Sequence, residues 1–242
     1  MWVNIFRPDN VQLAVEVIRT ALLENIWETF YMTMLSTIIS YVIGLPLGVL
    51  LVVGEPDGIR PMPSGFMHIV NVAVNLLRSV PFLILMIMVL PLSEVIVGTA
   101  VGTKAVIIPL IIASFPYIAR LVESSIRDVD KGIIEAAQSM GATPNQIIWK
   151  VMIPESLPSL VSGFTIALTT ILGYGAMAGI IGGGGLGMIA INYGYYRYKA
   201  LVMLIAVILL VVMVQIFQSV GTYLAIRCDK RIKLIKKRRK KG

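Results

Sequence analysis

The sequence predicts an all-α integral membrane protein with five transmembrane helices and one long polar loop, and its composition is the first reason. Hydrophobic residues make up 57% of the 242 residues, charged residues make up 14%, and the mean hydropathy is +0.86. A soluble globular domain carries about 25% charged residues, so a chain this poor in charge is typical of a protein in lipid. Its length leaves room for one membrane domain and for no separate soluble domain.

The second reason is the spacing of uncharged runs. Residues 29–54 contain no charged side chain, and a helix of this length can cross a hydrocarbon core of about 30 Å. Residues 1–28 alternate apolar and charged positions instead, with Val11, Val15 and Ile18 on one side and Glu16 and Arg19 on another. This pattern predicts a short amphipathic helix at the membrane interface. The predicted spans are residues 29–54, 68–92, 105–121, 157–180 and 200–226.

Two of these spans carry irregular features. In the first, Gly44 and Gly48 form a GxxxG pair around Pro46, which favours either a kinked helix with a close contact face or a flexible surface toward lipid. The uncharged part of the third span is short, so we expect Lys104 and Arg120 to reach from its two ends toward the headgroups.

Residues 130–158 form a long polar stretch between apolar runs, and their order predicts two short helices joined by a tight turn. Asp130 is placed to cap the first helix. Gly141 lies where a helix ends in a left-handed conformation.

The second helix of this stretch has its own start and stop signals. Thr143 and Gln146 predict a capping box, with Pro144 at the first helical position. Because proline lacks a backbone N–H, we expect Pro154 and Pro158 to end this helix and begin the next span.

The same stretch carries a recognisable motif: Glu135-Ala136-Ala137, then Gly141, then Ile153-Pro154. It resembles the EAA loop in permease subunits of bacterial ABC importers. Further segments, within residues 27–226, resemble the methionine-importer branch of that family. Those segments are Arg78-Ser79-Val80-Pro81-Phe82, Gly141-Ala142-Thr143-Pro144 and Gly173-Tyr174-Gly175-Ala176-Met177 with Gly183-Gly184-Gly185-Leu186-Gly187.

The resemblance implies that the loop is a cytoplasmic coupling helix, which docks into a cleft on an ATP-binding subunit. Small side chains would keep one side of this helix thin, and Glu135 would supply a polar contact at its start. The resemblance also implies a second copy of this chain, two ATP-binding subunits that hold ATP and Mg²⁺, and an extracellular substrate-binding protein. This chain itself would bind no cofactor. The implied docking residues are Glu135, Ala136, Ala137, Met140, Gly141, Ala142 and Pro154.

Positive charge is concentrated in residues 227–242, which hold ten of the 21 Lys and Arg residues. A basic tail directly after an apolar span is typical of a cytoplasmic anchor on anionic lipid. Five spans then put the N-terminus outside, and we expect a multi-pass protein of the bacterial plasma membrane. The chain divides into an N-terminal amphipathic segment 1–28, a transmembrane permease domain 29–226 and the basic tail 227–242.

A polar stripe in the second span indicates a substrate path. Arg78 lies well inside this span, where a guanidinium costs at least about 2.5 kcal/mol unless it faces water, a carboxylate or the protein interior. Asn71 and Asn75 share its helical face, and Ser79 precedes an expected kink at Pro81. Arg78 either lines the path or pairs with a helix end near the headgroups.

Residues 173–179 are a second candidate for the path. The glycines and alanines let helices approach closely, and among them Tyr174 and Met177 project large side chains. Met177 either gates the path through its flexible, polarisable side chain or serves as an ordinary packing residue.

Several other functions are excluded or disfavoured. Residues 182–187 match a dinucleotide fingerprint, but an apolar span precedes them, so we interpret them as a close helix contact or a flexible rim. No Walker A motif, nucleophile–base pair or metal-ligand set is present, which predicts that the chain is not an enzyme. The single Cys228 excludes an internal disulfide. No folded basic face accompanies the tail, so nucleic acid is not an expected partner. Acidic residues interrupt the N-terminus, so we expect no cleavable signal peptide.

The sequence therefore predicts the permease subunit of an ATP-driven importer for methionine, with ATP hydrolysis on a separate subunit. The methionine substrate is implied by the resemblance alone. Two alternatives stay open: the same importer class with another small amino acid or related solute, and an ATP-independent channel or membrane scaffold.

Overall fold

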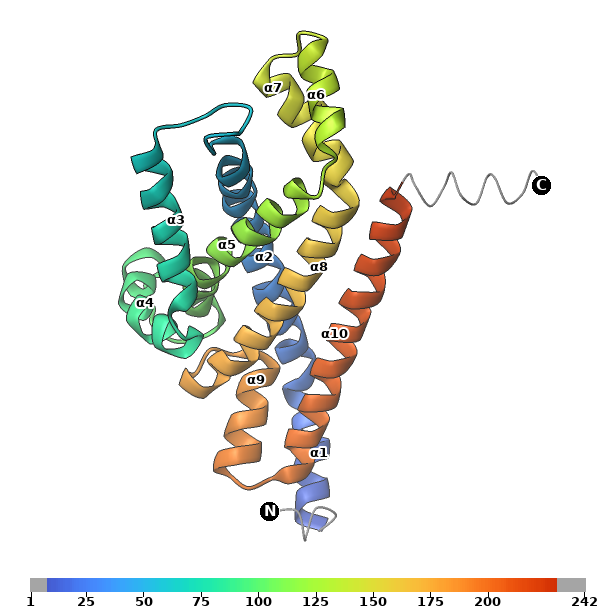
Figure 1. The fold of residues 1–242 in the computed structure, drawn as a ribbon. Coiled ribbons are helices and arrows are strands. Elements are labelled where there is room, and N and C mark those ends of the chain that lie inside the picture. The colour runs from blue at the N-terminus through green and yellow to red at the C-terminus, as the bar shows by residue number, and fades with distance from the viewer. Residues whose placement is uncertain (1–7, 230–242) are drawn as a thin grey trace, which may run out of the picture. The chain divides into compact units, whose positions relative to one another are not determined.

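The computed structural model describes residues 8–229, and each regular element in this range is helical (Figure 1). Two π-helical segments, Ile148–Met152 and Ala190–Tyr196, and one 3-10 turn, Gly179–Ile181, interrupt or join the α-helices. The α-helices are α1 (Pro8–Thr20), α2 (Leu22–Val53), α3 (Ser64–Ser79), α4 (Phe82–Val97), α5 (Thr103–Arg127), α6 (Lys131–Ser139), α7 (Pro144–Ile147), α8 (Ile153–Ala178), α9 (Gly185–Ile189) and α10 (Ala200–Cys228).

Four helical runs within the described residues are long and apolar enough to cross a membrane. A bent pair, α3 followed by α4, would make a fifth span if its two helices are counted together. The predicted all-α membrane fold is confirmed, and the predicted number of five depends on this pair. The four single runs are Leu22–Val53, Thr103–Arg127, Pro144–Ile181 and Ala200–Cys228.

The first span begins earlier than predicted, because α2 starts at Leu22 and not at residue 29. Glu24 lies in its first turn, where the exposed N–H groups of a helix favour a negative charge. Asn25 and Thr29 are buried in the next turns, and each side chain donates a hydrogen bond to the carbonyl one turn back, at 2.8 Å. Polar residues therefore extend the helix rather than end it.

The second span is broken where a kink was predicted. α3 ends at Ser79 and α4 starts at Phe82, with 16 residues in each helix. Pro81 has φ −56° and ψ 132°, an extended conformation, and a proline also disfavours the helical region for the residue before it. Neither helix alone has the roughly 20 residues that a hydrocarbon core requires.

The chain divides into two compact units, and each is described by itself. The first unit contains residues 8–40, 80–114 and 168–217, and the second contains residues 41–79, 115–167 and 218–229. The division falls inside α2, α5, α8 and α10.

In the first unit, α1 packs through Ala14 and Val17, which are 3% and 5% exposed. Their cluster includes Ile189, Val202 and Ala206 from the segments that follow α8. The predicted short helix is therefore confirmed, but its buried side is not the expected one: Val11 and Val15, assigned to the apolar face, are 39% and 45% exposed.

In the second unit, the GxxxG pair of α2 lies directly against α5. A Cβ atom added at Gly44 would lie 2.7 Å from Ile118 Cγ2, and one added at Gly48 would lie 2.5 Å from the Ala119 carbonyl oxygen. Hydrogen in place of Cβ lets the two backbones approach this closely. The predicted contact face is therefore confirmed.

Candidate functional site

The first helix of the polar loop, α6, begins and ends as predicted. The Asp130 side chain accepts a hydrogen bond from the Gly132 amide at 2.8 Å. At the other end Gly141 has φ +77°, a conformation that side chains other than glycine rarely adopt. Its amide donates to the Gln138 carbonyl at 2.9 Å, and the Ala142 amide donates to the Ala137 carbonyl at 3.1 Å.

The start of the second helix is also confirmed. The Gln146 amide donates to Thr143 Oγ1 at 3.4 Å, and the Thr143 amide donates to Gln146 Oε1 at 2.9 Å. These two bonds form the predicted capping box, with Pro144 in the first turn. Because both ends of the turn are capped, α6 and α7 form one well-defined element.

The predicted end of this helix is wrong. The chain stays helical from Pro144 through Ile181, and Pro154 and Pro158 lie within α8 rather than ending a helix. A π-helical segment, Ile148–Met152, directly precedes α8, whose second residue is Pro154. A π turn changes which carbonyls lack an N–H partner, so it accommodates prolines without breaking the helix. The loop therefore continues into α8 without a non-helical hinge.

The loop exposes a set of apolar side chains. Ile133 is 41% exposed, Met140 80% and Trp149 66%, and Ala136 shares the face of Ile133 and Met140 at helical spacing. Ala137 is only 5% exposed and faces the interior of its own unit. The two alanines that were expected to thin one side of the helix thus point in different directions, because consecutive helical residues are about 100° apart.

Beneath α6 lies a polar pocket with a volume of about 570 Å³. Glu135 and Gln138 line it from α6, and Glu55 and Asp57 line it from the loop after α2. Pro154 is partly buried at the start of α8. Glu135 therefore faces this pocket rather than the exposed apolar face.

Arg120 contacts both asparagines of the predicted polar stripe. Its Nη2 donates to Asn71 Oδ1 and to Asn75 Oδ1, each at 2.9 Å, and its Nη1 donates to Glu123 Oε2 at 2.6 Å. α5 continues to Arg127, so Arg120 lies inside the helix and not at its end as predicted. Its side chain is 20% exposed and that of Glu123 is 11% exposed.

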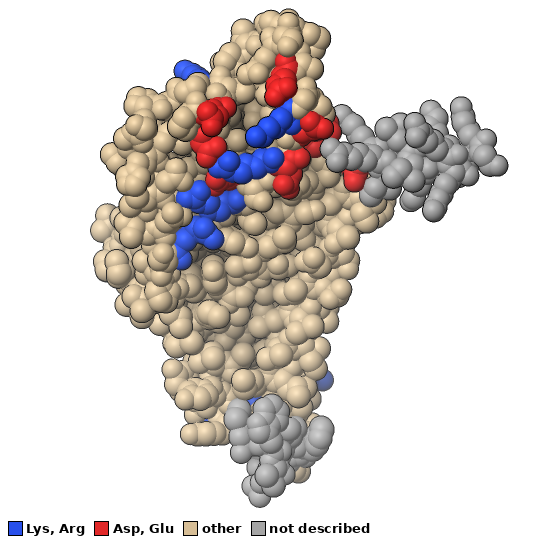
Figure 2. All heavy atoms as spheres, in the orientation of Figure 1, with Lys and Arg blue, Asp and Glu red and all other residues tan. Residues whose placement is uncertain are grey.

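A second arginine extends this set of contacts. Arg127 Nη2 donates to Glu123 Oε1 at 2.8 Å, and the Arg127 guanidinium holds Glu55 through two bonds of 2.9 and 2.6 Å. We call Glu55, Arg127, Glu123, Arg120, Asn71 and Asn75 the arginine network. Figure 2 shows that most charged side chains visible on this face gather in one band over the end of α5. The hydrogen bonds from Arg127 hold the pKa of the Glu55 carboxyl below its ordinary value of 4.5.

Arg78 and Ser79 are not members of this network and lie at the exposed end of α3. Ser79 Oγ donates to the Asn75 carbonyl at 2.8 Å. The stripe was expected to centre on Arg78, but Asn71 and Asn75 bind Arg120 instead. The sequence contained a signal for this network: Arg120, Glu123 and Arg127 recur at the spacing that places charges on one helical face.

The second path candidate lies in α8, in the first unit. The ring of Tyr174 stacks on Phe82 with a centroid distance of 4.4 Å and an interplanar angle of 9°. Met177 is 48% exposed. Phe82 begins α4 directly after the break at Pro81, so this stack fastens the start of α4 to α8.

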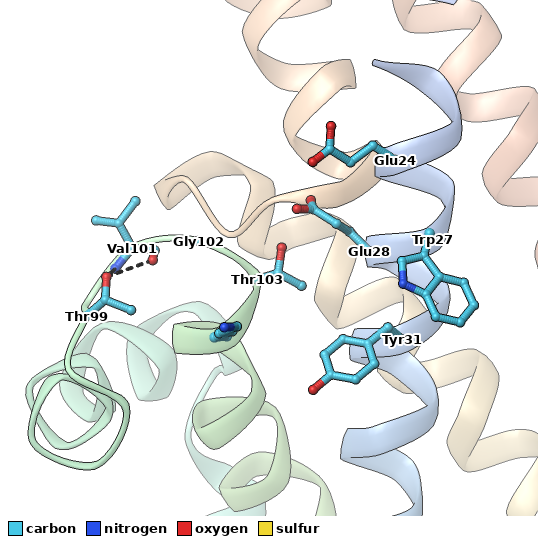
Figure 3. A pocket seen from close by; sticks show the side chains of 9 residues that line it. Glu24, Trp27, Glu28, Tyr31, Thr99, Val101, Gly102 and Thr103 are labelled. Carbon is cyan, nitrogen blue, oxygen red and sulfur yellow. Dashed lines mark hydrogen bonds between the residues drawn. The ribbon is translucent and has the colours of Figure 1, made fainter. Parts of the chain in front are cut away.

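The glycine-rich segment before α9 is a close contact, as predicted. Gly184 and Gly185 have φ +78° and +68°, and side chains of α2 cap the helix that follows. Glu28 Oε2 accepts from the Gly185 amide, and Thr29 Oγ1 accepts from the Leu186 amide, both at 2.8 Å. Figure 3 shows Glu28 beside Thr103, with Glu24 and Tyr31 on the same side of α2, around a surface pocket.

Within residues 8–229, no group of three or more His, Cys, Asp or Glu side chains is arranged to hold a metal ion. The described residues define a class, an α-helical, multi-pass membrane component with an exposed helical loop. The features that define it are several apolar helical runs, a close glycine-mediated helix contact and a polar loop with capped helices. The chain belongs to the family described as the inner membrane component of binding-protein-dependent transport systems, whose model matches residues 44–229. It is thus a membrane-embedded transport subunit rather than an enzyme.

Curated relatives agree with this family. One, described as a probable D-methionine transport system permease protein of Vibrio cholerae, is 46% identical over 211 residues, covering 87% of this chain and 93% of the relative. Another, a D-methionine transport system permease protein of Escherichia coli K12, is 46% identical over 158 residues, covering 65% of this chain and 72% of the relative.

Solved structures share the fold. A chain of the MetNI methionine ABC transporter, in an inward-facing conformation, matches with a TM-score of 0.86 and 43% identity, over 89% of this chain and 99% of that one. An amino acid ABC transporter solved with histidines matches with a TM-score of 0.72 at 19% identity, and shares the fold alone.

Proposed function

We propose that this chain is the permease subunit of an ATP-driven importer and forms the translocation path for methionine. The observation that carries this proposal is the 46% identity, over 87% of this chain, to a relative described as a D-methionine permease. A transport path is lined by residues from several helices, so identity spread over nearly the whole chain supports a shared substrate better than one local motif would.

We further propose that the loop at α6 and α7 docks on an ATP-binding subunit. Exposed apolar side chains on an otherwise polar loop are typical of a protein contact surface, and Ile133, Met140 and Trp149 provide them. Of the residues that the resemblance assigns to docking, Ala136, Met140 and Gly141 lie on the exposed side of the loop. Glu135 and Ala137 support it from beneath, and Ala142 and Pro154 connect it to α7 and α8.

The assembly that this loop serves would contain two copies of the chain and two ATP-binding subunits, which hold ATP and Mg²⁺. An extracellular binding protein would deliver the substrate. ATP binding would close the ATP-binding subunits and open the path outward, and hydrolysis would return it inward. Because the loop continues into α8 without a hinge, movement of the loop would tilt α8 directly.

The path itself is proposed to include residues of α3 and α8. Asn71, Asn75, Arg78 and Ser79 are the polar positions of α3, and Tyr174 and Met177 are the large side chains in a glycine-rich part of α8. Exposure of Arg78 and Met177 in this chain supports the assignment, since polar or flexible groups that face a path need no partner within the chain.

We also propose the orientation and division of the chain that its charges predict. The basic tail 227–242, which lies largely outside the described residues, would anchor the cytoplasmic end. The segment 1–28 would lie at the outer interface before the permease domain 29–226, and α2, which begins at Leu22, would enter that domain from the outside.

The test is uptake of labelled methionine into vesicles that hold this chain, its ATP-binding subunit and its binding protein. Met140→Glu should abolish copurification of the ATP-binding subunit and ATP-dependent uptake, because Met140 is 80% exposed at the loop. Val101→Glu is the matched control, since Val101 is an exposed apolar residue of another loop, and it should leave copurification intact.

The possible results separate the alternatives. Copurification without methionine uptake would keep the importer class and reject methionine as the substrate. Uptake that needs no ATP, or a wild-type chain that never copurifies with an ATP-binding subunit, would favour a channel or scaffold. Normal copurification by Met140→Glu would reject the docking surface.

A further inference from the structure

The arginine network is a continuous set of hydrogen bonds from the base of the docking loop to α3. Glu123 is its centre, because its two carboxylate oxygens bind different arginines: Oε2 accepts from Arg120, and Oε1 accepts from Arg127. Beyond Arg127 lies Glu55, and beyond Arg120 lie the two asparagines of α3. All of these residues belong to the second unit.

The network is balanced in charge, which explains how it persists near the apolar interior. Two guanidinium groups face two carboxylates, and the two asparagine oxygens accept from Nη2 of Arg120. Bidentate and forked contacts of this kind need arginine, because its planar group presents several donors in fixed directions. Removal of one charged partner would leave a poorly solvated charge unpaired.

The position of Arg127 ties the network to the docking loop. Arg127 is the last residue of α5, and the N-cap residue of α6, Asp130, follows three positions later. Glu55, Arg127 and Glu135 line the same pocket beneath α6. A displacement of α6 therefore acts on Arg127 through a very short piece of backbone.

At the other end, α3 shares one small apolar cluster with α2 and α5, in which Met67 and Val70 pack with Leu51 and Ala119. Of its described residues only Met67 and Val74 are buried, while Ile69 and Leu76 are 68% and 63% exposed. The two hydrogen bonds from Arg120 add a polar attachment of α3 to α5 beside this cluster. α3 in turn ends at the break before α4, and it carries the proposed path residue Arg78.

We propose that Arg120 is a positioning residue for transport: its guanidinium holds α3 through Asn71 and Asn75 and makes α3 follow movements of the docking loop. The inference rests on the proposed docking of this loop on an ATP-binding subunit. Arg120 acts through the asparagines that it holds, and no role in contacting the substrate or the partner is assigned to it. Its role is to couple movement of α3 to movement of the loop. Without these hydrogen bonds, the complex would hydrolyse ATP but transport little solute.

Two variants test the link from its two sides. Arg120→Lys keeps the positive charge beside Glu123, but one ammonium group cannot reproduce the fork that reaches both asparagines. Asn71→Leu with Asn75→Leu leaves Arg120 and Glu123 paired and removes the acceptors on α3. Ser124→Ala and His68→Gln are matched controls, since both residues are exposed on the same two helices.

The first measurement uses the isolated chain in detergent and needs no partner. Backbone amide exchange should speed up across α3 in both variants, while α5 and α6 keep their wild-type protection. Wild-type protection of α3 in both variants would overturn the proposal, whatever the function of the chain. Failure of the proposed function would leave this measurement unaffected.

The second measurement is the amount of solute transported per ATP hydrolysed in the reconstituted complex. Couplings between sites are typically worth about 5- to 150-fold in equilibrium terms, so we expect this ratio to fall about tenfold in Arg120→Lys, with ATP hydrolysis within about twofold of wild type. The asparagine variant is measured by amide exchange only, because Asn71 and Asn75 are themselves proposed path residues. A merely structural role would lower uptake and hydrolysis in parallel and leave the ratio unchanged, and that result would reject Arg120 as a coupling residue.

Discussion

Gly48 offers a sharp test of the contact between α2 and α5. In Gly48→Ala, the new Cβ would lie 2.5 Å from the Ala119 carbonyl oxygen, 2.6 Å from Val122 Cβ and 2.8 Å from Val122 Cγ1. Two of these three atoms cannot rotate away, because one belongs to the backbone and the other is a branched Cβ. The helices must therefore move apart by several tenths of an ångström.

The size of the effect follows from two opposing contributions. Overpacking of this kind costs about 1–3 kcal/mol. Replacement of glycine by alanine inside a helix returns about 0.5–1 kcal/mol through helix propensity. With the middle of each range, the expected net loss of stability is about 1 kcal/mol, which lowers the Tm of a chain of this size by about 2–4 °C.

Gly163→Ala is the matched control, because Gly163 is also a buried helical glycine of the second unit. Its nearest neighbours to an added Cβ are Leu121 Cβ at 3.7 Å and Ser125 Oγ at 4.0 Å, which are ordinary contact distances. Only the gain in helix propensity from glycine to alanine remains, and it is worth about 0.5–1 kcal/mol of stability. We therefore expect the Tm of this variant to stay level or to rise by a few degrees.

The assay is thermal unfolding of the purified chain in detergent, with both variants measured beside wild type. Opposite shifts for Gly48→Ala and Gly163→Ala are expected. The reasoning is refuted if Gly48→Ala is as stable as Gly163→Ala, because α2 and α5 would then not be in close backbone contact.

Three further predictions concern the polar loop and the arginine network. Glu123→Gln should lower the free energy of unfolding by about 2–4 kcal/mol, toward the lower end of the range for broken buried pairs because Glu123 is slightly exposed. Unfolding in denaturant measures this loss, and an unchanged unfolding midpoint would contradict the network. Thr143→Ala should remove the capping box and lower stability by about 1 kcal/mol. Amide exchange should become faster in α6 and α7 alone, and Asn145→Ala in the same turn should leave it unchanged. The Glu55–Arg127 pair should add stability above the ordinary carboxyl pKa of 4.5 and lose it as the pH falls through the lowered folded-state pKa. The Tm values of wild type and Glu55→Gln should therefore differ at pH 7 and converge only at a pH below 4.5. Convergence already at pH 6 would assign the difference to another group.

The polar loop shows how far local signals predict structure. Asp130, Gly141 and the Thr143–Gln146 capping box each act within one helical turn, so their spacing in the sequence was sufficient to place α6 and the start of α7. The prediction that Pro154 and Pro158 end the second helix was wrong, because the effect of a proline depends on the conformation of the backbone before it. A π-helical segment accommodates Pro154, and residue type alone does not reveal that segment.

The charged residues of the spans show the limit of local signals. Arg78 was predicted to lie well inside a span, but it lies in the last turn of α3, directly before the break that precedes α4. Arg120 was assigned to a helix end, since the apolar run stops there. Its hydrogen bonds to Asn71 and Asn75 join residues that are 49 and 45 positions apart in the sequence. The periodicity of one helix cannot predict a hydrogen-bond partner that lies on another helix.

By itself, the sequence determined the helical membrane class, the approximate limits of the apolar runs and the capping of the loop, because hydrophobicity and helix termini depend on neighbouring residues. Its family motif also predicted the transport role. Only the tertiary structure decided which glycines bring backbones together, which alanine of the loop is buried and which arginine holds the asparagines of α3. These features depend on contacts between helices that are distant along the chain, and such contacts exist only once the chain has folded.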